Sequence, residues 1–223
     1  MRHFLVASLC VLLAGCASGK QPHGRAAAQP VLRGPTPEEQ AKVDEALAPL
    51  VAPSDICRPV EPCAVGLAIE PLQRIHIAAG PAPPKKFVIR ITTGALRSLE
   101  PAELQAALAH ELGHVQLGHF ESREVRRLAE RSTEAGPNAA SDDALRTNRA
   151  SDREEELAAD RYAVELLDRL PGSPPGRGCA DVLLLLERLD LEQLTPGWAN
   201  WLSTHPTPAA RLKALQAECD KKP

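Results

Sequence analysis

Two histidines and a glutamate lie within five consecutive residues, in the pattern His-Glu-x-x-His at His110, Glu111 and His114. If this stretch is helical, His110 and His114 stand on one face, one turn apart, because a helix has about 3.6 residues per turn. Two imidazoles so placed can bind one Zn²⁺, and Glu111 is then placed to reach a water bound to that metal. The spacing is typical of a metalloprotease site with two His ligands and a Glu general base.

The motif has only three fixed positions, so the segment that carries it must support the interpretation. Apolar residues recur at helical spacing over residues 101–115. Pro101 suits the first position of a helix, and Glu103 suits its first turn. The surroundings therefore predict an amphipathic helix, and the alternative is a helix whose two histidines simply face solvent.

A third ligand is expected downstream, in the acidic stretch of residues 154–160. Glu156 and Asp160 are one helical turn apart, so Glu156 can ligate the metal while Asp160 accepts the outer N–H of a ligating histidine. His119 would lie nearly opposite His110 on a continuing helix, so it cannot join the site unless the helix breaks. The alternative for the acidic stretch is a solvated helix start.

The combination resembles the M48 zinc metallopeptidases, the gluzincins related to the Ste24 and HtpX proteases, and in particular their periplasmic lipoprotein members. The motifs are His-Glu-Leu-Gly-His at residues 110–114, Glu-x-x-Ala-Asp at residues 156–160 and Thr-His-Pro at residues 204–206. The resemblance covers roughly Val88 to Leu215. It implies one Zn²⁺ per chain, Glu111 as the base, and the ligands His110, His114 and Glu156.

The fold class expected from this resemblance and from the residue patterns is α+β and zincin-like, mainly helical with one small β-sheet beside the active-site helix. Short apolar runs predict strands at residues 63–69, 74–78 and 87–92. Capping residues and apolar periodicity predict helices at residues 37–50, 101–115, 151–170 and 180–191, and from residue 208 onward. The polar segment 132–150 is predicted to be a long loop, which is able to cover the cleft.

The N-terminus carries the signature of a lipoprotein signal peptide. Residues 4–15 are apolar, follow Arg2, and end in Leu-Ala-Gly immediately before Cys16. This pattern predicts a signal peptide over residues 1–15, with cleavage before Cys16 and lipid on that cysteine. The alternative is an ordinary cleaved signal with a coincidental cysteine.

The rest of the chain divides into a tether and a domain. Residues 16–35 are rich in Pro, Ala, Gly and Gln and are expected to form a flexible linker. Residues 36–223 are expected to be the metallopeptidase domain. Ala17, rather than aspartate, follows the lipidation site, which suggests sorting to the outer membrane with the domain facing the periplasm. The formal net charge is only −3, which argues against nucleic acid as a partner.

Four cysteines remain beyond Cys10 and Cys16, and an even number in an exported chain suggests two disulfides. Three pairings are possible. The first predicted pair is Cys57–Cys63, two cysteines that are close in the sequence. The second is Cys179–Cys219, which would join the last helix to the apolar helix before it. A zinc site built from these residues is less expected, because the chain has no Cys-x-x-Cys pair.

His205 is a further candidate because the resemblance places its His-Pro segment at the cleft. There it could donate to the oxyanion that forms during peptide hydrolysis, or cap the metal in a latched state. Tyr162 and Arg211 are other donors in reach by the same resemblance. The alternative is a turn residue whose ring fills space beside Trp198 and Trp201.

The expected activity is zinc-dependent endopeptidase cleavage, by analogy with the family. Its substrates would be polypeptides, namely unfolded or misassembled envelope proteins, which points to a role in protein quality control. The membrane is the other expected partner, through lipid on Cys16. The rival hypothesis is a non-catalytic or latched zinc-binding chaperone that assists assembly of outer-membrane proteins. An intact Glu111 weighs against a pure binder, which has no need of that carboxylate.

Overall fold

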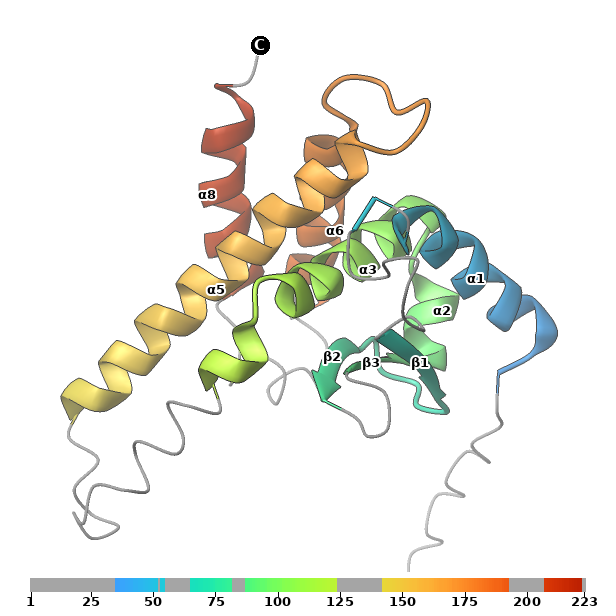
Figure 1. Cartoon of the computed structure of the whole chain (residues 1–223), viewed down its shortest axis with the longest axis horizontal. Coiled ribbons are helices and arrows are strands. Elements are labelled where there is room, and N and C mark those ends of the chain that lie inside the picture. Colours follow the sequence, from blue (N-terminus) through green and yellow to red (C-terminus); the bar gives the residue numbers. More distant parts are fainter. Residues whose placement is uncertain are drawn as a thin grey trace, which may run out of the picture. The chain divides into compact units, whose positions relative to one another are not determined.

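The structure is a computed structural model that describes residues 35–51, 53–54, 65–81, 87–123, 142–192 and 207–221. All of these residues belong to one unit of the chain, residues 32–223. The elements follow in the order α1 (Pro37–Val51), β1 (Val65–Glu70), β2 (Ile77–Pro81), β3 (Phe87–Thr92), α2 (Thr93–Ser98), α3 (Pro101–Gln116), α5 (Asp142–Asp168), α6 (Arg177–Glu192) and α8 (Pro208–Cys219) (Figure 1).

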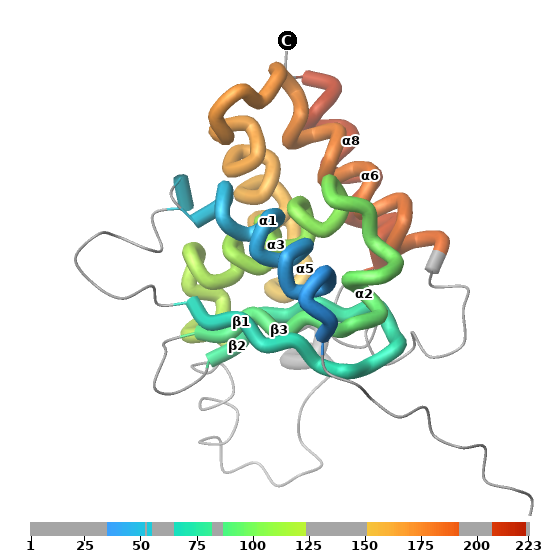
Figure 2. The backbone as a smooth tube through the Cα atoms, turned by 90° about the vertical axis from the view of Figure 1, so that its right-hand side faces the viewer, coloured from blue at the N-terminus to red at the C-terminus, as the bar shows by residue number. Residues whose placement is uncertain are grey.

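The three strands form one sheet in the order β1-β3-β2. The central strand β3 pairs in parallel with β1 and antiparallel with β2, so that Ile89 faces both Leu67 and Ala79. Alternate residues of β3, including Ile89 and Ile91, are fully buried, as expected for a sheet with one face against a core. β2 lies at an edge of this sheet and also packs on α3. Figure 2 shows the sheet below α1 and α3.

Helix α3 lies at the centre of the helical layer. It packs against α1, α5, α6 and the edge strand β2 (Figure 1). Pro101 occupies its first turn, and the Glu103 carboxylate accepts the backbone N–H of Glu100 at 2.7 Å, which stabilises the helix start. Every residue from Glu103 to Val115 is buried. Because α3 is enclosed, the polar side chains on it must find partners inside the protein.

The first helix is stabilised by a capping box, and the last helix is held by a disulfide. Thr36 and Glu39 form a capping box at the start of α1, with backbone nitrogen to side-chain oxygen distances of 2.9 and 3.2 Å. Cys179 of α6 and Cys219 of α8 form a disulfide. α8 packs on both α6 and α5. The disulfide therefore holds the last helix against the layer that contains α3.

The predicted class is confirmed: the fold is α+β and zincin-like, mainly helical with one small sheet beside the helix of the His-Glu-x-x-His motif. None of the helices in the described residues combines the length and apolar character needed to cross a membrane.

Several predicted boundaries were wrong. The second strand is β2 at residues 77–81 rather than 74–78. The backbone just before β2 makes hydrogen bonds outside the strand ladder. The His76 N–H donates to the Thr92 hydroxyl, and the Leu72 carbonyl accepts from the Gly94 N–H. These bonds hold the chain in a turn beside the start of α2, a short helix that the sequence patterns did not predict.

The long loop expected at residues 132–150 was also wrong in its second half. α5 begins at Asp142, so the predicted start at residue 151 lies inside the helix. No proline or glycine interrupts residues 142–151, and nothing therefore stops the helix from extending toward the N-terminus. α6 likewise begins at Arg177, ahead of the predicted residue 180.

Candidate metal centre

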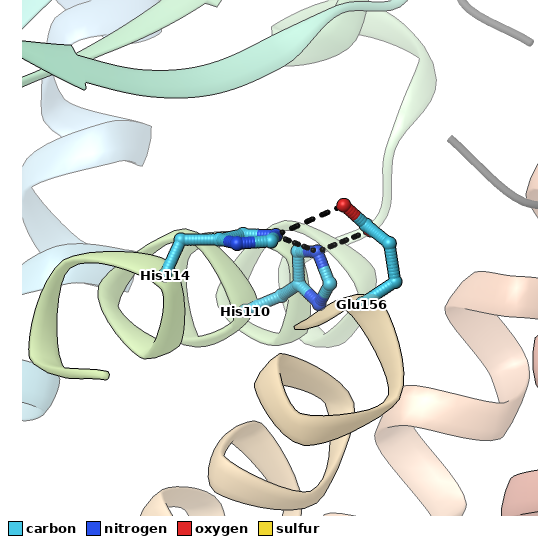
Figure 3. A group of neighbouring side chains, drawn as sticks. All are labelled: His110, His114 and Glu156. Carbon is cyan, nitrogen blue, oxygen red and sulfur yellow. Dashed lines mark hydrogen bonds and ion pairs between the residues drawn. The ribbon is translucent and has the colours of Figure 1, made fainter. Parts of the chain in front are cut away.

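The structure brings together the three side chains that the sequence singled out as metal ligands. His110 and His114 come from α3 and Glu156 from α5, and all three point toward one another in Figure 3. The two Nε2 atoms are 3.1 Å apart, and each lies 3.3 Å from an oxygen of the Glu156 carboxylate. Among the described residues, this is the group of ligand atoms that converges closely enough to hold a metal ion.

The outer nitrogens of both imidazoles are occupied by other side chains. His110 Nδ1 lies 2.9 Å from Asp160 Oδ1, the contact expected from the one-turn spacing of Glu156 and Asp160. His114 Nδ1 lies 2.8 Å from the Nδ1 atom of His119. With hydrogen bonds at Nδ1, both rings present Nε2 to the centre of the cluster.

His119 reaches His114 because α3 ends just before it. The helix stops at Gln116, and Gly118 adopts a φ of 69°, which glycine tolerates far better than other residues. Residues 119–123 then form a further helical turn. On a continuing helix His119 would lie away from the site, and Gly118 is the residue in the sequence that signals the end of α3.

Arg211 of α8 closes the cluster from the side of His110. Its Nε lies 2.8 Å from Asp160 Oδ2, and its Nη1 lies 3.2 Å from Glu156 Oε2. The Arg211 side chain is fully buried, so these carboxylates replace the water that the guanidinium loses. Nothing in local sequence spacing links residue 211 to residues 156 and 160; only the family resemblance had named it.

Arg123 makes the corresponding contacts on the side of His114. Its Nε lies 2.8 Å from Glu155 Oε2, and its Nη2 lies 3.4 Å from Glu156 Oε1. Arg123 is therefore paired with carboxylates at the cluster instead of lying free in solvent. Glu155 is itself buried, and this ion pair compensates its charge.

Helices α3 and α5 approach closely beside these ligands. A Cβ atom placed on Gly113 would lie 3.0 Å from the carbonyl oxygen of Ala159 and 3.2 Å from Cδ1 of Tyr162. These separations are shorter than ordinary van der Waals contacts. The glycine of the motif therefore lets α5 come near enough for Glu156 to meet the two histidines.

The ionisable groups of the cluster have strongly displaced pKa values. Burial and Arg211 lower the pKa of His110, but Asp160 and Glu156 outweigh them and raise it to about 9. Burial raises the pKa of Asp160, but Arg211 and His110 outweigh it and lower it to about 2. The pKa of Glu156 is held well below its usual value, since contacts to His110 and His114 overcome the effect of burial. Burial and His114 lower the pKa of His119 to about 4.

The donor set fits a divalent cation. Two imidazole nitrogens and a carboxylate oxygen are typical ligands of zinc. With the imidazoles neutral, the buried carboxylates outnumber the two arginines by two negative charges. These carboxylates are Glu111, Glu155, Glu156 and Asp160. One divalent cation would balance that excess, so charge and ligand chemistry agree.

Glu111 lies beside the ligands and faces the edge strand. Its Oε2 accepts the backbone N–H of Ala79 in β2 at 2.6 Å. Glu111 and His110 also line a pocket with Arg211. The remaining walls are mostly aliphatic and come from Ile75, Ile77, Leu99, Ala107, Leu185 and Leu189, with His76 beside them. A carboxylate, a backbone edge and an apolar pocket thus adjoin the metal ligands.

Other predicted residues are placed differently or fall outside the described part of the chain. The Tyr162 hydroxyl donates to the Ser54 carbonyl at 3.0 Å, so it is engaged away from the ligands, whereas Arg211 lies at the cluster. The predicted Cys179–Cys219 disulfide is present. The other predicted positions lie outside the described residues, namely Cys16, Cys57, Cys63 and His205.

Comparison with known proteins gives a matching protein family and related sequences. The family model described as Peptidase family M48 matches residues 78–219. Over 79 residues, 35% of this chain and 23% of the relative, the chain is 39% identical to "Protease HtpX homolog 1" of Streptomyces coelicolor. Over 33 residues, 15% of this chain and 11% of the relative, it is 58% identical to "Protease HtpX homolog 2" of Methanosarcina acetivorans.

The matched segments span less than a quarter of the length of either relative. No solved structure gives a significant match to the chain. The family match is much longer, because it runs from β2 through the motif helix and Glu156 to the end of α8. It covers more than half of the sequence and includes every ligand of the candidate metal centre, and the chain therefore belongs to peptidase family M48.

Proposed function

We propose that the protein is a zinc-dependent endopeptidase that holds one Zn²⁺ through His110, His114 and Glu156. The observation that carries the proposal is the convergence of these three buried side chains, from two helices, beside a further carboxylate. Membership in a peptidase family supports the same conclusion. When bound, zinc would supply a Lewis acid that polarises the scissile carbonyl and acidifies water.

Glu111 is the proposed general base. Its carboxylate takes a proton from the attacking water and later transfers it to the leaving amine. The hydrogen bond that the Ala79 N–H donates, at 2.6 Å, holds one oxygen of the Glu111 carboxylate toward β2 and so orients the side chain. Glutamine at this position has nearly the same shape but cannot accept that proton.

The edge strand β2 is the proposed binding site for an extended substrate. Its other edge is paired with β3, and it packs beside α3, so a peptide aligned along it runs past Glu111. Backbone pairing of this kind recognises a peptide with little dependence on its side chains. The aliphatic pocket beside His110 and Glu111 then offers a place for one apolar side chain of that peptide.

Arg211 and His205 are the proposed contributors of positive charge or hydrogen bonds near the oxyanion. Arg211 already lies at the ligands. His205 is proposed to act at the metal, either as an oxyanion donor or as a latch. As a donor, its replacement by alanine lowers kcat by roughly 10²-fold with zinc retained. As a latch, the same replacement raises activity, and an unchanged rate and zinc affinity would leave it a structural turn residue.

The proposed setting is the periplasmic face of the outer membrane, with the chain anchored by lipid on Cys16. The support is the apolar N-terminal run that ends in Leu-Ala-Gly-Cys, followed by alanine. Substrates in that setting would be unfolded or misassembled envelope proteins, which makes protein quality control the proposed role.

The deciding experiment compares full-length wild type with Glu111→Gln in detergent. Zinc content is measured by elemental analysis, and proteolysis is measured with casein. The proposal expects about one zinc per chain in both proteins and cleavage by the wild type alone. Zinc binding without cleavage by wild type would favour the chaperone alternative, and cleavage by Glu111→Gln equal to wild type would remove Glu111 as the base.

A further inference from the structure

We propose that His119 is a positioning residue of the metal centre: it accepts the Nδ1–H of His114 and thereby holds the Nε2 of that histidine toward the metal. The inference rests on the proposed metal-binding function. It assigns a role to a histidine that lies outside the His-Glu-x-x-His motif and outside the ligand set.

The direction of the hydrogen bond follows from what a ligand must do. His114 can bind a metal through Nε2 only if that nitrogen carries a lone pair, which leaves the ring proton on Nδ1. His114 Nδ1 lies 2.8 Å from His119 Nδ1, so the two nitrogens share one proton. His119 therefore accepts through Nδ1. Both rings are buried, so water does not readily replace this bond.

The local backbone is shaped to bring His119 to this place. α3 ends with the Leu117 N–H donating to the Gly113 carbonyl, and Gly118 then turns the chain at a φ of 69°. The following residues 119–123 are helical, and Arg123 joins Glu155 of α5 at 2.8 Å. The segment is thus fixed at both ends, at the Gly118 turn and at the Arg123–Glu155 ion pair.

The two ligand histidines have different outer partners. His110 meets the Asp160 carboxylate at 2.9 Å, whereas His114 meets an imidazole. A carboxylate partner raises the basicity of a ligating imidazole and adds a negative charge. A neutral imidazole adds no charge, so His119 acts by orienting the ring of His114. Another uncharged hydrogen-bond acceptor of similar reach should therefore be able to replace it.

The test measures zinc affinity of the full-length protein by competition with a chromophoric chelator. We expect His119→Ala to weaken zinc binding by about tenfold or more, within the range known for outer partners of ligating histidines. His119→Asn should stay within about threefold of wild type, because its Oδ1 can take the place of Nδ1 as acceptor. The Co²⁺ absorption spectrum should change in His119→Ala and resemble wild type in His119→Asn.

Two controls separate positioning from packing. Leu117→Ala alters an exposed side chain in the same turn and should leave zinc affinity unchanged. His119→Leu fills the space without accepting a hydrogen bond and should behave like His119→Ala, and it decides the matter if the alanine variant does not fold.

Equal zinc affinity in wild type, His119→Ala and His119→Leu would overturn the inference while leaving the proposed function intact. A defect in His119→Asn as large as in His119→Ala would also overturn it, since only packing would then explain the loss. A wild type that binds neither zinc nor Co²⁺ would instead overturn the proposed function, and the inference with it.

Discussion

At the scale of single residues, Glu156 is held from both sides before any metal binds. Arg123 approaches one oxygen of its carboxylate at 3.4 Å, and Arg211 approaches the other at 3.2 Å. Removing one partner of a buried ion pair leaves an uncompensated charge, which is costly. Replacement of Glu156 should therefore affect both metal binding and the arginines around it.

The first prediction compares acids that are neighbours in sequence. Glu156→Ala should weaken zinc binding at least tenfold, whereas Glu154→Ala, at an exposed position on the same helix, should not. Glu155→Ala is a useful third comparison, because Glu155 is not a proposed ligand but its ion pair with Arg123 anchors the segment that carries His119. Titration with zinc decides, and equal losses in Glu154→Ala and Glu156→Ala would mean that the wrong acid has been assigned.

The second prediction concerns pH and follows from the pKa of His110, which is raised to about 9 from 6.5 in the metal-free protein. A raised pKa means that protonated His110 stabilises the fold fully below pH 6.5, and that this contribution is lost as the pH rises through 9. Zinc must displace the same proton, so zinc affinity should increase across that window.

Thermal unfolding of EDTA-treated protein across that pH window, beside chelator competition at each pH, measures both trends. His110→Gln is the matched control, since it lacks the titrating group and should show a smaller decline. A metal-free protein that becomes more stable with rising pH would contradict this account.

At the scale of elements, the contact between α3 and α5 sets the ligand geometry. The third prediction is that Gly113→Ala weakens zinc binding, because the added methyl group must move the Ala159 backbone and with it the α5 helix that carries Glu156. Alanine normally stabilises a helix by about 1 kcal/mol relative to glycine, so a loss of stability would run against helix propensity. Zinc titration and thermal unfolding check both effects, with the exposed Gln116→Ala as control.

The fourth prediction concerns the disulfide that joins α6 to α8. Replacing Cys179 and Cys219 by serine should destabilise the protein by about 3–4 kcal/mol on loop-entropy grounds. That corresponds to a decrease in Tm of roughly 6–16 °C for a domain of this size. Since α8 carries Arg211, some zinc affinity should be lost as well. Wild type with the disulfide reduced should match the variant, and an unchanged Tm in both would contradict the prediction.

Elements also mark the limit of what the sequence could predict. Spacing within a helix placed His110 and His114 on one face of α3, and Glu156 and Asp160 on one face of α5. Helical periodicity alone fixes which side chains share a face. Contacts between distant elements, such as Arg123 with Glu155, depend on how helices pack, and no local pattern encodes them. Gly118 lies between these cases. A glycine after a helical run signals that the helix ends, but only the structure shows that this end brings His119 to His114.

At the scale of the whole molecule, the metal centre is assembled from segments far apart in the chain. α3, α5 and α8 each contribute, and the disulfide holds the last of them in place. These elements all lie within the unit of residues 32–223, and the proposed lipid anchor lies outside it. The anchor and the site should therefore be separable by mutation.

The fifth prediction tests that separation. Cys16→Ala removes the only thiol at the predicted cleavage site, so the protein should leave the membrane fraction while zinc content and casein cleavage are retained. Cys10→Ala, in the apolar run of the same signal, is the matched control and should remain with membranes. Lipid on the mature N-terminus is measured by mass spectrometry of the first peptide. If Cys16→Ala protein stays with membranes after extraction of bound proteins, lipid on Cys16 is not the anchor. If it leaves them but loses zinc, the tether and the metal centre are coupled, because a residue far from the ligands in sequence then affects how the domain holds its metal.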